Sequence, residues 1–222
     1  MTEKEIIMAA TIQEFVHERG IKYLVHFTRE SNLTSIIQRG LVPRDLLAGE
    51  GGVKFNDTVR LDGTSAVCLS IDFPNYKMFF KVKQADVDES WAIVAVSPAV
   101  LSSPTVAFCA GNAASAAMTS IPIAQRMGLQ ALQGMYADWN GVSRATLGIP
   151  DRYPTNPQAE VLMLEGVSRE HILGVFALNQ AVKARLVATH AKLNERNVAV
   201  NASIFRYRQD YAHWKQVADS GI

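Results

Sequence analysis

The 222-residue sequence has little of several features that would place it in a special class of protein. It has only two cysteines, Cys68 and Cys109, and both lie in apolar segments, which favours buried reduced thiols over a disulfide or a metal site. The sequence has no apolar run long enough to span a bilayer. Residues 2–7 are charged and lack the apolar stretch of a signal peptide. These absences predict a cytoplasmic protein with no membrane partner.

An excess of positive charge is also absent, since the formal net charge is only +1. Bulk charge therefore does not indicate a nucleic-acid-binding protein. Two local basic clusters exist, one within residues 77–83 and one within residues 206–215, where tyrosines and a tryptophan intervene. Each cluster is compatible with nucleic-acid contact or with an ordinary solvated surface, and the sequence leaves both open.

The hydrophobic content of 48% predicts a packed core, and the length suits a single domain over residues 1–222. No repeat, low-complexity tract or linker interrupts the chain. No glycine-rich phosphate-binding motif of the Rossmann or P-loop type is present. The predicted helices and strands are mixed without a regular alternation, which favours the α+β class over a doubly wound sheet.

Apolar spacing and capping residues predict the following elements. Helices are expected at residues 3–19 with Gly20 as their end, at residues 32–39 between Ser31 as N-cap and Gly40, at residues 112–127, at residues 180–195 and in the C-terminal tail. Strands are expected at residues 21–27, 67–71, 92–96, 106–109, 160–164 and 172–178, and residues 198–204 are expected to be extended. Residues 41–62 and 135–158 are predicted to be mainly irregular.

Two segments far apart in the sequence carry polar side chains that are candidates for chemistry. His26 and Thr28 are two residues apart on a predicted strand, so their side chains share one face, and Asn32 follows at a helix start. Glu160 follows a proline-containing loop, residues 152–158, and opens an apolar strand. Ordinary structural roles are open for each: a hydrogen-bonded core histidine, an asparagine helix cap and a solvated glutamate.

Together with Arg60 and the Gly-Asn-Ala-Ala-Ser segment at residues 111–115, these residues resemble the DarT family of DNA ADP-ribosyltransferase toxins. The resemblance covers roughly residues 23–180 and includes Gln158-Ala-Glu160, which is similar to the Gln-x-Glu motif of other ADP-ribosyltransferases. It implies an ADP-ribosyltransferase-like split β-sheet around an NAD cleft, with flanking helices. It also implies transfer of ADP-ribose from NAD to a thymine or guanine base of single-stranded DNA, without a metal. A macrodomain antitoxin that removes the modification is the implied partner.

The chemistry of this implied reaction assigns a role to the carboxylate. Cleavage of NAD at the nicotinamide ribose develops positive charge on that ribose, and a carboxylate beside it stabilises the charge. Glu160 is the candidate for this catalytic role. Arg60 is the candidate that binds the pyrophosphate or helps to activate the acceptor base, and Arg44 is a nearby competitor.

The resemblance also implies binding residues. His26, Thr28 and Asn32 are expected to bind NAD. Asn112 is expected to present its amide to the substrate, or else to cap a helix. Tyr153 is expected to stack on an unpaired base, or else to pack locally. Unpaired DNA is the expected acceptor because a duplex hides the Watson–Crick edge of each base.

The sequence departs from the family pattern at two places. Residues 72–79 keep only part of an aromatic, methionine-containing stretch, and residues 144–158 lack the dense basic run that some members have. The second departure leaves the identity of the modified base open, since that loop is expected to contact the acceptor. Two alternatives stay open: an enzyme of the same fold that modifies RNA or protein, and a non-enzymatic module that binds NAD or nucleic acid.

Overall fold

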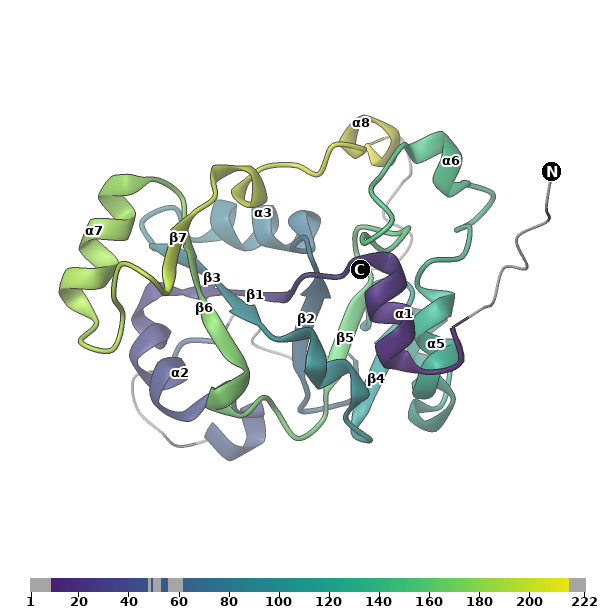
Figure 1. Cartoon of the computed structure of the whole chain (residues 1–222), viewed down its shortest axis with the longest axis horizontal. Helices are drawn as coiled ribbons and strands as arrows, with labels where there is room; N and C mark the ends of the chain where they lie inside the picture. Colours follow the sequence, from purple (N-terminus) through teal and green to yellow (C-terminus); the bar gives the residue numbers. More distant parts are fainter. Residues whose placement is uncertain (1–8, 48, 50–52, 56–61, 216–222) are drawn as a thin grey trace.

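The computed structural model describes residues 9–47, 49, 53–55 and 62–215 (Figure 1). Its centre is a seven-stranded sheet in the order β4-β5-β2-β1-β3-β6-β7. The strands are β1 (Leu24–Arg29), β2 (Val67–Ile71), β3 (Trp91–Val96), β4 (Val106–Cys109), β5 (Glu160–Met163), β6 (Ile172–Ala177) and β7 (Val198–Val200). Neighbouring strands are antiparallel except for β6 and β7, which are parallel. The mixed α+β class that the sequence predicts is confirmed.

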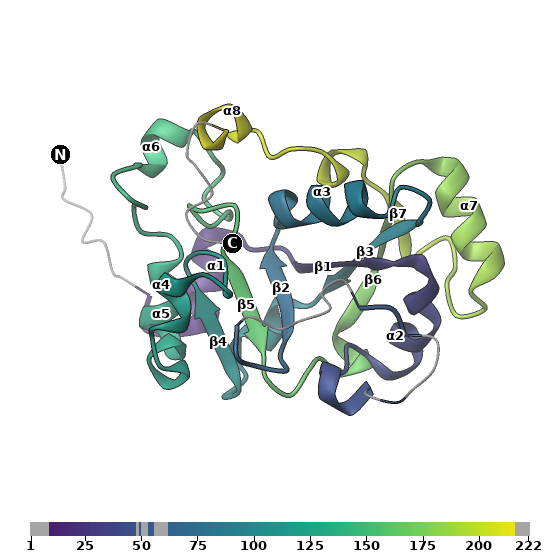
Figure 2. The ribbon, with the colours of Figure 1, turned by 180° about the vertical axis from the view of Figure 1, so that it is seen from behind.

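Helices lie around this sheet (Figures 1 and 2). They are α1 (Ile12–Arg19), α2 (Leu33–Arg39), α3 (Tyr76–Ala85), α4 (Ala116–Thr119), α5 (Gly128–Gly134), α6 (Arg144–Leu147), α7 (Gln180–Thr189) and α8 (Tyr211–Trp214). Helices α1 and α5 lie at the β4–β5 end of the sheet, and α2 and α7 lie at the β6–β7 end. Within the described part of the chain, no helix is long and apolar enough to cross a membrane.

The sheet is split between β1 and β2. These strands share only two residue pairs, Leu24 with Ile71 and Val25 with Ser70, whereas β1 pairs with β3 along its whole length. The short junction divides the sheet into one part with β4, β5 and β2 and another part with β1, β3, β6 and β7. The split arrangement that the family resemblance implies is therefore present, and the split creates room for a cleft.

Both faces of the central strands are covered. On β3, Ala92, Val94 and Val96 belong to the larger core cluster, while Ile93 belongs to a second, aromatic cluster on the opposite face. Side chains alternate between the two faces of a strand. A strand that is buried on both faces therefore needs an uninterrupted apolar sequence, as residues 91–96 have.

The sequence places several elements correctly. Strands β2 and β4 have the predicted bounds, and β3, β5 and β6 differ from prediction by one residue at an end. Helix α1 ends at Gly20 as expected, with a left-handed φ of 64°, and begins at a capping box formed by Thr11 and Glu14. Residues 3–8 of that predicted helix lie outside the described part.

Other predictions are wrong. The alanine-rich run at residues 112–127 is not one helix, because Ser115 caps the short α4 and Pro122 begins a separate 3-10 turn. Ser31 is not an N-cap, because a 3-10 turn at Glu30–Asn32 precedes α2. Helix α7 ends at Thr189 rather than at residue 195. Strand β1 begins three residues later than predicted, and the extended segment after residue 198 ends at Val200.

No helix is predicted from the sequence at residues 76–85 or at residues 128–134, which form α3 and α5. The apolar residues Tyr76, Phe79 and Val82 of α3 face the aromatic core cluster. The two cysteines are in no disulfide: Cys109 is buried and Cys68 is half-buried. Burial raises the pKa of the Cys109 thiol to about 11, so this thiol is protonated at neutral pH, in agreement with the expected buried, reduced cysteine.

Candidate active site

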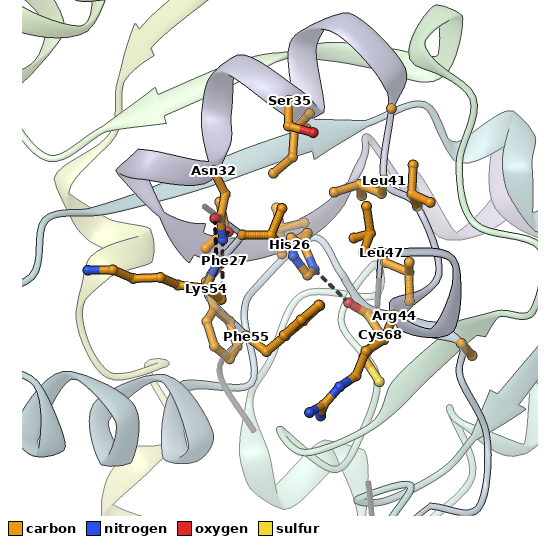
Figure 3. Close-up of a pocket in the computed structure, with 18 of the residues that line it drawn as sticks. His26, Phe27, Asn32, Ser35, Leu41, Arg44, Leu47, Lys54, Phe55 and Cys68 are labelled. Carbon is orange, nitrogen blue, oxygen red and sulfur yellow. Dashed lines mark hydrogen bonds between the residues drawn. The ribbon is translucent and has the colours of Figure 1, made fainter. Parts of the chain in front are cut away.

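A cavity of about 180 Å³ opens where β1 and β2 separate (Figure 3). Its wall is built by β1, by α2 and the chain that follows it, by residues 53–55 and by β2. Glu160, the first residue of β5, also lines it. The split in the sheet therefore brings His26, Thr28, Asn32 and Glu160, four candidate site residues, to the same cavity.

His26 bridges the two separating strands. Its Nδ1 lies 2.9 Å from the carbonyl oxygen of Cys68, just beyond the point where backbone pairing between β1 and β2 ends (Figure 3). A carbonyl oxygen only accepts, so Nδ1 carries the proton. Burial lowers the pKa of His26, although the bond to Cys68 opposes this shift, so the ring is neutral near pH 7. The neutral ring keeps Nε2 as a hydrogen-bond acceptor at the cavity.

Asn32 joins β1 to the segment that faces it across the cavity. Its Nδ2 donates to Thr28 Oγ1 at 3.1 Å and to the Lys54 carbonyl oxygen at 2.8 Å, and its Oδ1 accepts from the Lys54 amide at 3.1 Å. The side chain makes no cap bond to α2. Asn32 does occupy the N-cap position of α2, but its side-chain bonds position residues 53–55 and do not cap the helix.

Two arginines contact the same segment. Arg29 Nη1 donates to the Phe55 carbonyl oxygen at 2.9 Å, and the guanidinium of Arg44 lies 4.6 Å from the centre of the Phe55 ring. Arg44 lines the cavity and brings positive charge to it (Figure 3). Arg60, the arginine that the sequence favours over Arg44, lies outside the described residues.

The carboxylate of Glu160 is held at both oxygens. Oε2 accepts a hydrogen bond from the Ala113 amide at 2.8 Å, and Oε1 accepts one from Asn75 Nδ2 at 3.4 Å. Asn75 is itself held in place by two further bonds. Its Oδ1 caps α3 by accepting from the backbone amide of Met78, and its backbone amide donates to Ser70 Oγ. These contacts fix the orientation of the Glu160 side chain before any substrate binds.

Asn112 acts through the turn that it forms. Its Oδ1 accepts from the Ala114 amide at 2.8 Å, and its carbonyl oxygen accepts from the Ser115 amide and hydroxyl. This turn directs the Ala113 amide toward Glu160. Asn112 does not line the cavity and does not cap α4, whose N-cap is Ser115.

Tyr153 lies in the loop that precedes Glu160. Its ring is half-buried, packs edge-on against Phe73 at 5.8 Å between centroids and has the Arg152 guanidinium 4.8 Å from its centre. The ring does not line the cavity. Local packing, one of the two roles that the sequence leaves open, is therefore present for Tyr153.

Sequence reasoning missed three side chains that shape the site: Asn75, Arg144 and Arg208. Asn75 had a local signal, since an asparagine before the periodic apolar run at residues 76–85 is a typical helix N-cap. Arg144 and Arg208 bond to carbonyl oxygens of the loop before Glu160, and no local pattern reveals such contacts. The described residues also contain no cluster of side chains arranged to hold a metal ion.

A split α+β sheet with a histidine on one half and a glutamate opening a strand on the other defines an ADP-ribosyltransferase type of fold and site. The profile of the DarT family, described as ssDNA thymidine ADP-ribosyltransferase, matches residues 25–206. The match covers most of the sequence, and the chain belongs to this family of NAD-dependent enzymes. None of the curated protein sequences matches the chain at a significant level.

Solved structures of DarT proteins have the same fold. Thermus sp. 2.9 DarT in complex with ADP-ribosylated ssDNA matches with a TM-score of 0.54 and 13% identity over 84% of this chain and 97% of that one. The same protein in complex with NAD+ matches with a TM-score of 0.53 and 12% identity, over 83% and 98%. Thermosipho africanus DarTG in complex with ADP-ribose matches with a TM-score of 0.53 and 16% identity, and this chain spans 51% of its length.

Proposed function

We propose that this protein transfers ADP-ribose from NAD to the thymine base of a thymidine in single-stranded DNA, with Glu160 as the catalytic carboxylate. The observation that carries the proposal is the carboxylate of Glu160, oriented at a cavity by the Ala113 amide and Asn75. The sequence leaves thymine and guanine open, and the description of the family favours thymidine.

In the proposed reaction, Glu160 lies beside the nicotinamide ribose. The bond between C1′ of that ribose and the nicotinamide nitrogen breaks, and nicotinamide leaves with the electron pair. Glu160 stabilises the positive charge that develops on the ribose until a nitrogen of the base attacks C1′ and its proton passes to the solvent. Because the bonds from the Ala113 amide and from Asn75 already orient the carboxylate, little reorganisation is needed at this step.

The rest of the cavity binds NAD in this proposal. His26 offers Nε2 as an acceptor, and Thr28 lies on the same face of β1. Asn32 contributes by holding residues 53–55 against the cavity. Arg44 supplies positive charge suited to a pyrophosphate. Arg60 stays a prediction for the same task or for activation of the acceptor.

The acceptor approaches on the side of the loop that precedes Glu160. We infer that Tyr153 and the turn at Asn112 border the path of the unpaired base, since both lie next to elements that contact Glu160. A toxin role with a macrodomain antitoxin, in the cytoplasm, remains part of the proposal. It draws support from the family and from the fold shared with Thermosipho africanus DarTG.

The test is mass spectrometry of single-stranded oligonucleotides incubated with the protein and NAD. Four oligonucleotides that differ only in the base at one central position identify the base that is modified. Glu160→Gln keeps the shape of the side chain and is expected to lower transfer by at least about 100-fold, because the charge is lost. Glu165→Gln is the matched control, since Glu165 is exposed and follows the same strand.

The outcomes separate the alternatives. Addition of one ADP-ribose to the thymidine oligonucleotide alone supports the proposal, and addition to guanine would correct the base. Release of nicotinamide without any modified DNA would direct attention to RNA or protein acceptors. Binding of NAD without nicotinamide release would reject the assignment of the chain as an enzyme.

A further inference from the structure

The segment at residues 204–214, near the C-terminus, contacts two elements that flank Glu160. One is α3, whose cap residue Asn75 donates to Glu160, and the other is the loop at residues 150–158, which leads directly into β5. In both ribbon views this segment runs over α3 toward α6 (Figures 1 and 2). We propose that Arg208 is a positioning residue that holds this loop in the geometry needed to present DNA to Glu160. The proposal rests on the proposed function.

Arg208 uses every nitrogen of its guanidinium. Nε and Nη2 donate to the two carboxylate oxygens of Asp210 at 2.7 and 2.5 Å. Nη1 donates to the Pro154 carbonyl oxygen at 2.8 Å, and Nη2 donates to the Thr155 carbonyl oxygen at 2.7 Å. The planar fork of arginine makes such a set of directed bonds, which the single nitrogen of lysine cannot reproduce.

The pair of Arg208 with Asp210 is removed from water, with side-chain exposures of 3% and 0%. Trp214 Nε1 donates to Asp210 Oδ2 at 2.6 Å, so the carboxylate is satisfied from a second side. Burying two charges costs free energy, and an apolar pair of similar volume is often as stable. A buried ion pair whose bonds end on loop carbonyls is therefore better explained by the geometry that it imposes than by stability.

The loop is also held by Arg144 of α6. Nη1 of Arg144 donates to the Tyr153 carbonyl oxygen at 2.7 Å and to Thr155 Oγ1 at 3.1 Å. The Thr155 amide donates to the Met135 carbonyl oxygen at 2.9 Å. Thr155 is thus bonded through its amide, hydroxyl and carbonyl oxygen, five residues before Glu160. The two arginines determine where the chain turns into β5.

Aromatic rings on both sides of Arg208 anchor the segment to α3. Tyr207 stacks on Phe80 of α3 at 4.3 Å and on Tyr211 at 3.9 Å between centroids. Tyr76, the first residue of α3, packs edge-on against both tyrosines. These rings fix the backbone on both sides of Arg208, so its guanidinium reaches the loop from a rigid support.

Loosening of the loop has a specific expected effect. None of residues 150–158 lines the cavity that binds NAD in this proposal, so cleavage of NAD persists when the loop is misplaced. Presentation of the base to C1′ suffers instead, and water takes a larger share of the ADP-ribose. Arg208→Lys is therefore expected to raise the KM for the oligonucleotide about tenfold, with a larger ratio of free to DNA-bound ADP-ribose and an unchanged KM for NAD.

The experiment compares the wild-type protein, Arg208→Lys and Arg185→Lys in nicotinamide release and in modified oligonucleotide. Arg185 is the matched control, because it also pairs with a carboxylate, that of Glu30 at 2.7 Å, but lies on α7. Thermal unfolding of each variant reports on folding. Trp214→Phe keeps an aromatic side chain but removes the hydrogen bond to Asp210, so it is a milder perturbation. It replaces Arg208→Lys in the comparison if the Arg208→Lys protein does not fold.

A shift toward free ADP-ribose in Arg208→Lys or Trp214→Phe, absent in Arg185→Lys, supports the role of Arg208. A folded variant overturns it if its KM for the oligonucleotide and its ratio of free to DNA-bound ADP-ribose both equal those of the wild-type protein. An equal loss of NAD cleavage and DNA transfer also overturns it, because that result describes general damage to the fold. If the wild-type protein modifies no oligonucleotide, the proposed function fails first and the inference fails with it.

Discussion

The side-chain amide of Asn75 donates a hydrogen bond to Oε1 of Glu160 from a position 85 residues earlier in the chain. The same side chain caps α3 through its oxygen, so its orientation is set by the helix. Only 1% of Asn75 is exposed, and water does not compete for these bonds. Asn75 therefore couples the first turn of α3 to the proposed catalytic carboxylate.

Substitution of Asn75 separates its two roles. Asn75→Ala removes both bonds, and we expect a loss of about 1 kcal/mol of stability from the cap. Asn75→Ser keeps a cap oxygen but has no amide for Glu160, so stability is largely retained while kcat falls about tenfold, in line with the loss of a hydrogen bond to a charged group. Thermal unfolding and initial rates of DNA modification measure the two effects. Asn179→Ala, which removes the corresponding cap of α7, is expected to lower stability without changing kcat.

The two nitrogens of His26 are also separable. An asparagine places its amide near the position of Nδ1 and a glutamine places its amide near Nε2. His26→Asn therefore keeps a donor for the Cys68 carbonyl oxygen, and we expect nearly wild-type stability with about tenfold weaker NAD binding. His26→Gln leaves that carbonyl without its donor, which costs about 1–3 kcal/mol. Calorimetric titration with NAD and thermal unfolding test both; equal NAD affinity in His26→Asn and wild type would remove Nε2 from the proposed site.

Gly111 allows the close packing that brings the Ala113 amide to Glu160. A Cβ atom at Gly111 would lie 2.9 Å from Cη2 of Trp139 and 3.4 Å from Nδ2 of Asn156. We expect Gly111→Ala to displace the turn, to destabilise the protein by about 1–3 kcal/mol and to lower kcat. Gly134→Ala is the control, because nothing lies within 4 Å of its added Cβ. Unchanged kcat in a folded Gly111→Ala protein would show that the turn tolerates displacement.

Asp72 makes a pH-dependent contribution to stability. Burial raises the pKa of its carboxyl from 3.8 to about 6, although the Lys22 amide bonds to it and opposes this shift. A carboxyl whose pKa is higher in the folded than in the unfolded protein contributes stability below about pH 4 that is lost as the pH rises to about 6. At neutral pH this loss amounts to at most about 3 kcal/mol.

We therefore expect Asp72→Asn to be more stable than wild type at pH 7.5 and similar to it near pH 4. The Lys22 amide donates to both carboxylate oxygens of Asp72, and asparagine can still accept one of these bonds with its side-chain oxygen. Asparagine also tolerates the positive φ of 56° at this position. Thermal unfolding from pH 4 to pH 8 measures the difference, with Asp88→Asn at an exposed position as the control for the loss of one charge. A difference in Tm that is constant across this range would contradict the assignment to Asp72.

The sequence by itself determined the elements whose residues agree with one another locally. The apolar runs at residues 67–71 and 106–109 are almost entirely buried and became strands with the predicted bounds. Glu160 was predictable as the start of a strand, and the same-face placement of His26 and Thr28 follows from the period of a strand. Local propensity failed at residues 112–127, where turn and cap bonds of Asn112 and Ser115 outweigh the helix preference of alanine.

Only the tertiary structure decided which groups meet at the cavity. The bonds of His26 to Cys68, of Ala113 to Glu160 and of Asn75 to Glu160 join residues 42, 47 and 85 positions apart. Arg208 reaches the carbonyl of Pro154, 54 positions away. Backbone carbonyls and amides occur at almost every residue, so no side-chain pattern marks the ones that are used. Their choice follows from how strands and loops that are distant in the sequence pack together, and this packing sets the distances only in the folded chain.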